Sequence, residues 1–318
     1  MTPYAAPAWL PGGHAQTLWP RAIRPPLPLT RRERWATPDD DFVDVDRLDG
    51  PPDRPLLVLF HGLEGSSRSP YAAALAHVCR ASRWRLALPH FRGCSGELNR
   101  RPRAYHSGDS EEIDWILARL GAENGGRPLF AAGVSLGGNA LLKWAGERGV
   151  DAAHHVQAIA AVCAPLDLAA CGHHLARGFN RVYTRHFLNT LKAVSRQRLQ
   201  QFPGIFDALR MEAARNLHQF DDAVTGPLHG FAGADDYWAR CSSKPWLAHI
   251  RIPALVLNAR NDPFLPARYL PGPGEVGPGV ILEQPAAGGH VGFVSGAFPG
   301  HLDWLPQRLL HFFNSATS

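Results

Sequence analysis

The 318-residue sequence has no stretch that approaches about 18 uninterrupted apolar residues, which excludes a predicted membrane-spanning helix. Its N-terminus has neither a basic start nor a sustained apolar segment, so we expect no secretory signal peptide. Cysteine is scarce, with five residues and no C-x-x-C pair. This usage argues against a disulfide framework and a zinc site, and it favours a reducing, cytoplasmic location.

Lysine is nearly absent, since only Lys143, Lys192 and Lys244 occur. The net charge of +5 is therefore carried by arginine, in an Ala- and Pro-rich composition that a GC-rich genome would also produce. The chain has no long run of like charges and no basic stripe with interleaved aromatics, so we expect no nucleic-acid partner. A composition of 45% hydrophobic and 19% charged residues is typical of a globular chain with a large core.

Short apolar runs alternate with helical patterns along most of the chain. We predict helices at 69–82 and 139–149, and a third after the D-x-x-E capping signature of Asp109 and Glu112. The predicted strands lie at 56–60, 85–91, 128–133, 158–164, 254–259 and 280–284. Buried strands that alternate with helices indicate an α/β fold, a mostly parallel sheet flanked by helices.

The alternation stops over 166–247, where helical patterns occur without a convincing strand. An insertion between two core strands predicts a helical cap over the site. We therefore expect an irregular N-terminal segment at 1–54 that packs on the core, a core formed by 55–165 and 248–318, and a cap at 166–247. The last helix should start near His301 and be interrupted or offset by Pro306.

The predicted cap helices carry apolar faces bordered by arginine, and two interpretations are open. The apolar faces could pack on the body while the arginines meet water, which we favour for most of them. Alternatively, the faces line an acyl pocket in which arginine attracts anionic head groups, with a medium-chain acyl preference. The arginines concerned are Arg185, Arg196, Arg198 and Arg210.

Residues 133–138 read G-V-S-L-G-G, between a predicted strand and a predicted helix. A serine on a sharp strand-to-helix turn, with glycine two positions away on each side, is the nucleophile elbow of α/β-hydrolases. The turn lifts the Ser135 hydroxyl above the sheet, while Gly133 and Gly137 let strand and helix approach closely. Ser135 is therefore the candidate nucleophile.

A serine hydroxyl is a weak nucleophile that needs an adjacent base, and the base needs an acid to orient it. In this fold the acid and then the histidine follow the serine along the chain. Asp262, after the strand at 254–259, is the candidate acid, and Asp167 is its competitor after an earlier strand. His290, on the glycine-rich loop A-A-G-G-H-V-G-F, is the candidate base.

The other acids and histidines fit these roles less well. We interpret Asp235 and Asp236, in the insertion, as helix caps or surface charges. The pairs His154–His155 and His173–His174 lack the spacing of zinc ligands and are interpreted as surface residues.

Two backbone N–H groups should form the oxyanion hole. One belongs to Leu136, directly after the nucleophile. The other is expected from the loop after the strand at 56–60, where His61 and Gly62 shape the turn and Leu63 is the candidate donor.

Further motifs narrow the match: H-A-Q-T at 14–17, H-G-L-E-G-S-S at 61–67, F-R-G-C-S-G at 91–96, F-D-D-A-V-T-G-P-L-H-G-F at 220–231 and G-A-D-D-Y-W at 233–238. Through them nearly the whole chain, cap included, resembles the YheT-like esterases of the α/β-hydrolase superfamily. The resemblance implies Ser135 as nucleophile, Asp262 as acid and His290 as base, in agreement with the residues themselves. Eukaryotic relatives often carry a membrane anchor before the hydrolase domain, and we expect none here.

The sequence thus predicts a serine hydrolase that cleaves carboxylic esters of short- to medium-chain or lipid-like acids, without cofactor or metal. An acyltransferase that uses the same acyl-enzyme and a non-catalytic ligand-binding homologue are the alternatives. The expected partner is a small-molecule ester, and peripheral membrane contact stays open. The sequence leaves open the natural substrate, the oligomeric state and the role of His14.

Overall fold

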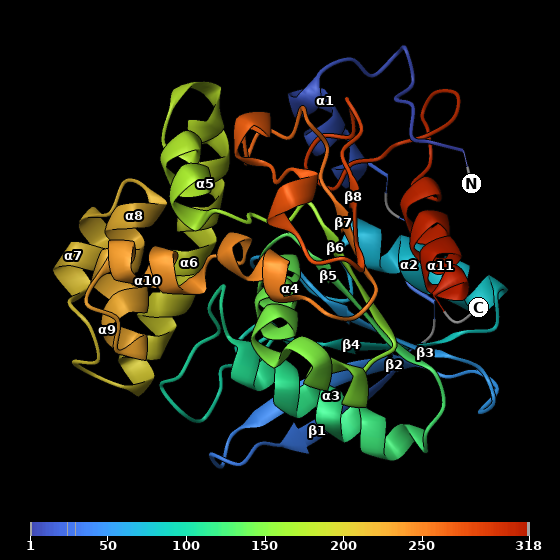
Figure 1. Cartoon of the computed structure of the whole chain (residues 1–318). Coiled ribbons are helices and arrows are strands. Elements are labelled where there is room, and N and C mark those ends of the chain that lie inside the picture. Colours follow the sequence, from blue (N-terminus) through green and yellow to red (C-terminus); the bar gives the residue numbers. More distant parts are fainter. Residues whose placement is uncertain (1, 24, 29, 317–318) are drawn as a thin grey trace.

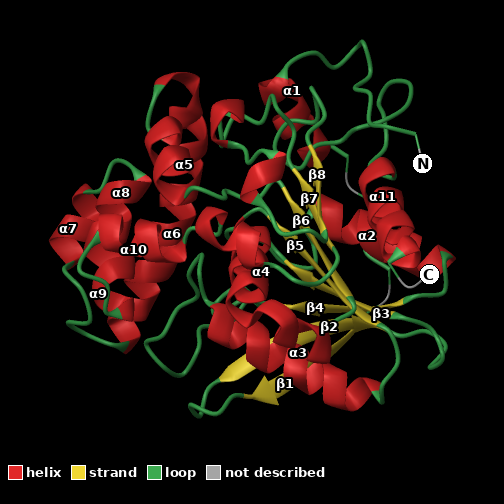
Figure 2. Ribbon diagram, viewed as in Figure 1, coloured by secondary structure: helices red, strands yellow, loops and turns green. Residues whose placement is uncertain are grey.

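The structure is a computed structural model that describes residues 2–23, 25–28 and 30–316 (Figure 1). Its centre is one sheet with the strand order β1-β2-β4-β3-β5-β6-β7-β8, in which β2 is antiparallel to β1 and β4 and the other neighbours are parallel (Figure 2). This confirms the predicted fold class. The strands are β1 (Arg31–Ala36), β2 (Phe42–Leu48), β3 (Leu56–Phe60), β4 (Arg85–Pro89), β5 (Leu129–Val134), β6 (Ala158–Val162), β7 (Ala254–Leu257) and β8 (Val280–Glu283).

Helices cover both faces of the sheet, because its central strands are apolar on both faces. In β3, Leu57 and Leu59 join one core cluster, whereas Val58 and Phe60 join the other. The first cluster includes side chains of α2 (Pro70–Ala81) and α11 (Trp304–Ser315), which pack together. The second includes side chains of α3 (Ser110–Asn124) and α4 (Leu136–Arg148), on the opposite face (Figure 2). A strand buried on both faces explains the unbroken apolar run at 56–60.

The expectation of an irregular segment over 1–54 is wrong for 31–48, which forms β1 and β2; α1 (Gly13–Leu18) precedes them. The charged residues of β2, which reads F-V-D-V-D-R-L, do not suggest a buried strand. The strand nevertheless buries Asp44 and Asp46. Arg34 donates two hydrogen bonds of 2.8 Å to Asp44. Arg32 donates two, of 2.7 and 2.9 Å, to Asp46. Carboxylates can be buried when they are paired in this way.

Two expectations about helix ends are correct only in part. The last helix begins at Trp304, three residues after His301, and Pro306 lies in its first turn, where a missing N–H interrupts no helical hydrogen bond. At the start of α3, Asp109 occupies the predicted N-cap position, but its side chain accepts a hydrogen bond from Arg103 (2.7 Å) instead of capping the helix. Its partner in the expected capping box, Glu112, accepts one from Arg92 (2.6 Å).

Between β6 and β7 the chain forms six α-helices that stand beside the sheet, at the left of Figure 1. They have a small apolar core of their own, which includes Leu188, Met211 and Phe220. We propose residues 166 and 247 as the boundaries between this helical insertion and the core. Among the described residues no helix has the length and apolar character needed to cross a membrane. The helices are α5 (Leu168–Leu175), α6 (Arg181–Gln201), α7 (Ala208–Ala213), α8 (Leu217–Phe220), α9 (Gly226–His229) and α10 (Ala234–Cys241).

Candidate active site

Ser135 occupies a strained turn between β5 and α4. Its backbone angles, φ of 52° and ψ of −120°, lie in a region that residues other than glycine rarely adopt. A Cβ on Gly133 would come within 2.4 Å of the Gly137 carbonyl oxygen, and a Cβ on Gly137 within 2.5 Å of the Phe60 carbonyl oxygen. Glycine at both positions therefore permits the close approach that holds the turn.

The loops after β7 and β8 bring two further side chains to this serine. His290 Nε2 lies 2.9 Å from Ser135 Oγ, and His290 Nδ1 lies 2.9 Å from Asp262 Oδ2. An ionised carboxylate only accepts hydrogen bonds, so Asp262 orients the imidazole with its proton on Nδ1 and leaves Nε2 free to accept from the serine hydroxyl. The three residues predicted from the sequence are thus adjacent.

The surroundings hold Asp262 and His290 in place. The Asp262 side chain is 2% exposed, and its Oδ1 accepts a hydrogen bond from the Phe264 N–H (2.8 Å). The Phe264 ring stacks on the His290 imidazole with centroids 3.8 Å apart. These contacts leave the imidazole little freedom to rotate away from Ser135.

The competing acid, Asp167, lies at the N-terminus of α5 and caps it. Its Oδ1 accepts a hydrogen bond from the Ala170 N–H (2.9 Å). Asp235 contacts His218 (3.0 Å), and Asp236 contacts Arg240 (3.3 Å) at the surface of the insertion. None of the three is hydrogen-bonded to His290 within the part of the chain that the structure describes.

The candidate oxyanion donors flank the serine. In the described residues, no hydrogen bond from the backbone N–H of Leu63 or Leu136 is present, so both remain available to a ligand. A Cβ on Gly62 would lie 3.1 Å from the Ser135 Cβ, which shows how closely the loop after β3 approaches. His61 holds that loop, because its Nε2 accepts from the Phe91 N–H (3.0 Å) and its Nδ1 is hydrogen-bonded to the Gly62 carbonyl (2.8 Å). Burial lowers the pKa of His61 to about 3, which keeps Nε2 an acceptor.

The N-terminal H-A-Q-T motif holds the loop that carries His290, a role that sequence reasoning missed. Thr17 Oγ1 accepts a hydrogen bond from the His290 N–H (2.8 Å). Gln16 is 2% exposed, and its Oε1 accepts from both the Gly288 N–H and the Asn261 amide (2.9 Å each). His14 Nδ1 lies 3.1 Å from the Tyr183 hydroxyl on α6, so the motif also contacts the insertion. The motif itself was visible, but its contacts lie far away in the sequence.

We expect Gln16→Leu to lower kcat about 10- to 100-fold with little change in KM. The variant removes the acceptor that positions the loop of His290, and displacing a reacting group by about 1 Å costs rate at this scale. Steady-state kinetics with a chromogenic ester measure the effect, and Gln307→Leu on the exposed side of α11 is the matched control. A loss of thermal stability with unchanged kcat would contradict a positioning role.

Two cavities meet at Ser135. One lies beneath the insertion and encloses about 1120 Å³ of empty space, including its open mouth; its lining is largely apolar. The other opens between the N-terminal segment, α6 and the end of the chain, and is lined by Leu18, Tyr71 and Leu302 among others. Ser135 lines both, whereas His290 lines only the second.

The lining of the first cavity supports each of the two interpretations of the insertion for different residues. Phe187, Leu191 and Val194 of α6 face the cavity, as the acyl-pocket interpretation expects. Arg185, Arg196 and Arg210 are exposed, as the packing interpretation expects. Arg198 differs from these three, because it is buried and lines the cavity.

One cluster of side chains has donor atoms close enough to share a metal ion. Atoms of Cys163, Asp262 and His290 lie within 4.8 Å of one another. Both imidazole nitrogens of His290 are already hydrogen-bonded, and the Cys163 sulfur accepts from the Val291 N–H (3.3 Å). A metal ion bound there would therefore displace one of these hydrogen bonds.

Comparisons with known proteins agree with the fold. A family model described as "alpha/beta hydrolase fold" matches residues 55–297. "Putative esterase YheT" of Escherichia coli is 40% identical over 302 residues, which cover 93% of this chain and 88% of that protein. "Phospholipase ABHD3" of Mus musculus is 28% identical over 321 residues, covering 97% and 77%.

Among solved structures, the Pyrococcus furiosus esterase Pf2001 superposes with a TM-score of 0.58 at 13% identity, covering 93% of this chain and 98% of that one. At that identity the match shows the fold alone. The family model and the 40% identical relative carry the assignment: the chain belongs to the α/β-hydrolase fold family and, within it, to the YheT-like esterases.

Proposed function

We propose that this esterase hydrolyses carboxylic esters through an acyl-enzyme on Ser135. The observation that carries the proposal is the hydrogen-bonded series Asp262–His290–Ser135 at the junction of two cavities. Esters fit because an apolar cavity beside a polarised serine suits an acyl chain. The five free cysteines are compatible with a reducing, cytoplasmic location, which we also propose.

In the acylation step, Ser135 Oγ forms a bond to the acyl carbon while its proton moves to His290 Nε2. The electron pair of the carbonyl π bond moves to its oxygen, which the N–H groups of Leu136 and Leu63 stabilise. Each such donor contributes about 3 to 4 kcal/mol to catalysis in serine hydrolases. The pair then re-forms the carbonyl, the bond to the alcohol oxygen breaks, and His290 gives its proton to that oxygen.

The position of His290 assigns the two cavities to the two halves of the ester. The leaving oxygen must face Nε2 to receive the proton, and His290 lines only the cavity beside the N-terminal segment. The alcohol half therefore lies there, and the acyl half lies beneath the insertion. In deacylation, water enters from the alcohol side, gives a proton to His290 and attacks the acyl carbon. The acid is released and Ser135 regains its proton.

Labelling with a fluorophosphonate probe tests the nucleophile. We expect covalent modification on the peptide that contains Ser135, detected by mass spectrometry, and no modification in Ser135→Ala. Ser195→Ala is the matched control, because Ser195 lines the same cavity and should leave labelling unchanged. Modification at another serine would overturn the proposal, and product analysis with added alcohol separates hydrolysis from acyl transfer.

A further inference from the structure

Arg198 is a buried cation whose guanidinium has no hydrogen-bonding acceptor among the described residues, although it lies in the cavity beneath the insertion. The residue is 5% exposed and lines the same cavity as Ser135. Across the described ranges, its guanidinium forms no hydrogen bond and no ion pair. Burial lowers its pKa, yet an arginine remains charged in a protein. The five N–H donors of its guanidinium thus have no acceptor among the described residues, and the cavity that Arg198 lines is largely apolar.

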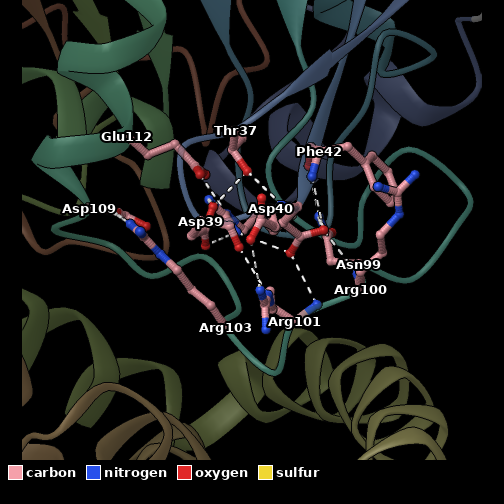
Figure 3. A network of polar contacts seen from close by, with 12 residues as sticks. Thr37, Asp39, Asp40, Phe42, Asn99, Arg100, Arg101, Arg103, Asp109 and Glu112 are labelled. Atoms are coloured by element: carbon pink, nitrogen blue, oxygen red, sulfur yellow. Dashed lines mark hydrogen bonds and ion pairs between the residues drawn. The ribbon is translucent and has the colours of Figure 1, made fainter.

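The other buried arginine of the described chain shows what a satisfied guanidinium looks like here. Arg92 is 4% exposed and donates to Glu112 (2.6 Å), to Asp39 (2.8 and 3.1 Å) and to Asp41 (3.1 Å). Figure 3 shows the surrounding network, in which Asp39 and Glu112 converge. Burying an unpaired charge costs free energy, so the contrast indicates that an acceptor for Arg198 comes from outside the chain.

The acids of the same cavity have other partners. Glu64 Oε1 accepts from the Tyr105 hydroxyl (2.7 Å). Asp221 accepts from Thr225 (2.7 Å) and from the Trp238 indole (2.8 Å). In the described structure neither forms a hydrogen bond or ion pair with Arg198, although Glu64 is close enough to attract its charge.

A second unsatisfied group lies in the lining of the cavity. His229 Nε2 is buried and has no hydrogen-bond partner within the described residues. Burial lowers the pKa of His229 to about 3, so the imidazole is neutral and can donate through Nε2 in one tautomer. A buried cation and an unused ring nitrogen together suit a ligand with acceptor oxygens.

Arg198 lines the cavity beneath the insertion and not the one that His290 lines. We propose that Arg198 binds an oxyanion, such as a carboxylate, at the far end of the acyl half of the ester. The substrate class is then a monoester of a dicarboxylic acid, and hydrolysis gives the alcohol and the free diacid. This inference rests on the proposed function and adds the chemistry of the acyl chain.

The test compares p-nitrophenyl monoesters of adipic and suberic acid with p-nitrophenyl hexanoate and octanoate. We expect Arg198→Gln to lower kcat/KM about 30-fold (about 2 kcal/mol) for the carboxylated esters and less than about 3-fold for the uncharged ones. Arg198→Met, which keeps the apolar packing, should behave alike. Arg196→Gln is the control, since Arg196 is exposed on the same helix and pairs with Glu212.

Binding gives a readout that is independent of turnover. Titration calorimetry of adipate into Ser135→Ala should show an affinity that is about 30-fold weaker once Arg198→Gln is added. Equal effects of Arg198→Gln on charged and uncharged esters would overturn the inference, as would a larger effect on esters with a phosphate on the alcohol half. If the enzyme hydrolyses p-nitrophenyl hexanoate and Ser135 is labelled, the proposed function stands whatever the effect of Arg198→Gln. If it hydrolyses none of these esters, both the proposed function and this inference are wrong.

Discussion

Ser135→Ala is expected to lower kcat for ester hydrolysis about 10⁴- to 10⁶-fold, because it removes the hydroxyl oxygen that we propose as the acyl carrier. The residual rate over water would come from the oxyanion donors and from binding. Fold and affinity should persist, since a smaller side chain fits the turn whose approach depends on Gly133 and Gly137. Pre-steady-state and steady-state rates on one chromogenic ester measure the loss.

Control experiments separate a lost nucleophile from a damaged protein. The thermal midpoint of Ser135→Ala should change little, because the substitution removes one partly buried hydrogen bond, to His290, and no packed contact of the core. Substantial residual activity, at a tenth of the wild-type rate, would show that another group performs the attack. Ser82→Ala, at an exposed serine that lines neither cavity, should keep the wild-type rate.

Asp262→Asn is expected to lower kcat about 10⁴-fold, and Asp167→Asn less than about 3-fold. An amide at 262 can present its NH₂ group to His290 Nδ1, which favours the tautomer with the proton on Nε2 and removes the acceptor for the serine hydroxyl. An amide at 167 still caps α5, because Asn is as good an N-cap as Asp. The pair is matched in chemistry and differs only in location.

Equal losses in the two variants would show that charge, and not the contact at 2.9 Å, is what matters. A near-native rate in Asp262→Asn would show that another residue orients the histidine. Measuring kcat from pH 5 to 9 adds a check, since loss of the carboxylate that contacts His290 should change the pH profile of kcat.

The sequence predicted those parts of the fold whose signals are local. The runs at 56–60 and 254–257 are apolar on both faces, so their burial in a parallel sheet follows from composition alone. Ser135 was found because glycine spacing and a strand-to-helix switch lie within a few residues. Asp262 and His290 needed the known chain order of the fold, and their adjacency to Ser135 became visible only in three dimensions.

The parts that could not be predicted depend on distant pairing. β2 buries Asp44 and Asp46 by pairing them with arginines of β1. Without knowledge of that pairing, its charged residues predict an exposed segment. Gln16 and Arg198 look like ordinary polar residues of a loop and of a helix. Gln16 matters because it is hydrogen-bonded to the loop that carries His290. Arg198 matters because folding of the insertion buries it without a hydrogen-bond acceptor in the described part of the chain.

Gln16 and Thr17 form hydrogen bonds with residues 245 to 273 positions further along the chain. A ribosome makes these first residues long before the loop at 288–290 exists, and domains fold as their chain emerges. The segment around Ser135 can therefore fold during synthesis, while His290 is held in place only once the loop at 288–290 has emerged. A nascent or prematurely terminated chain would carry a shaped but inert serine.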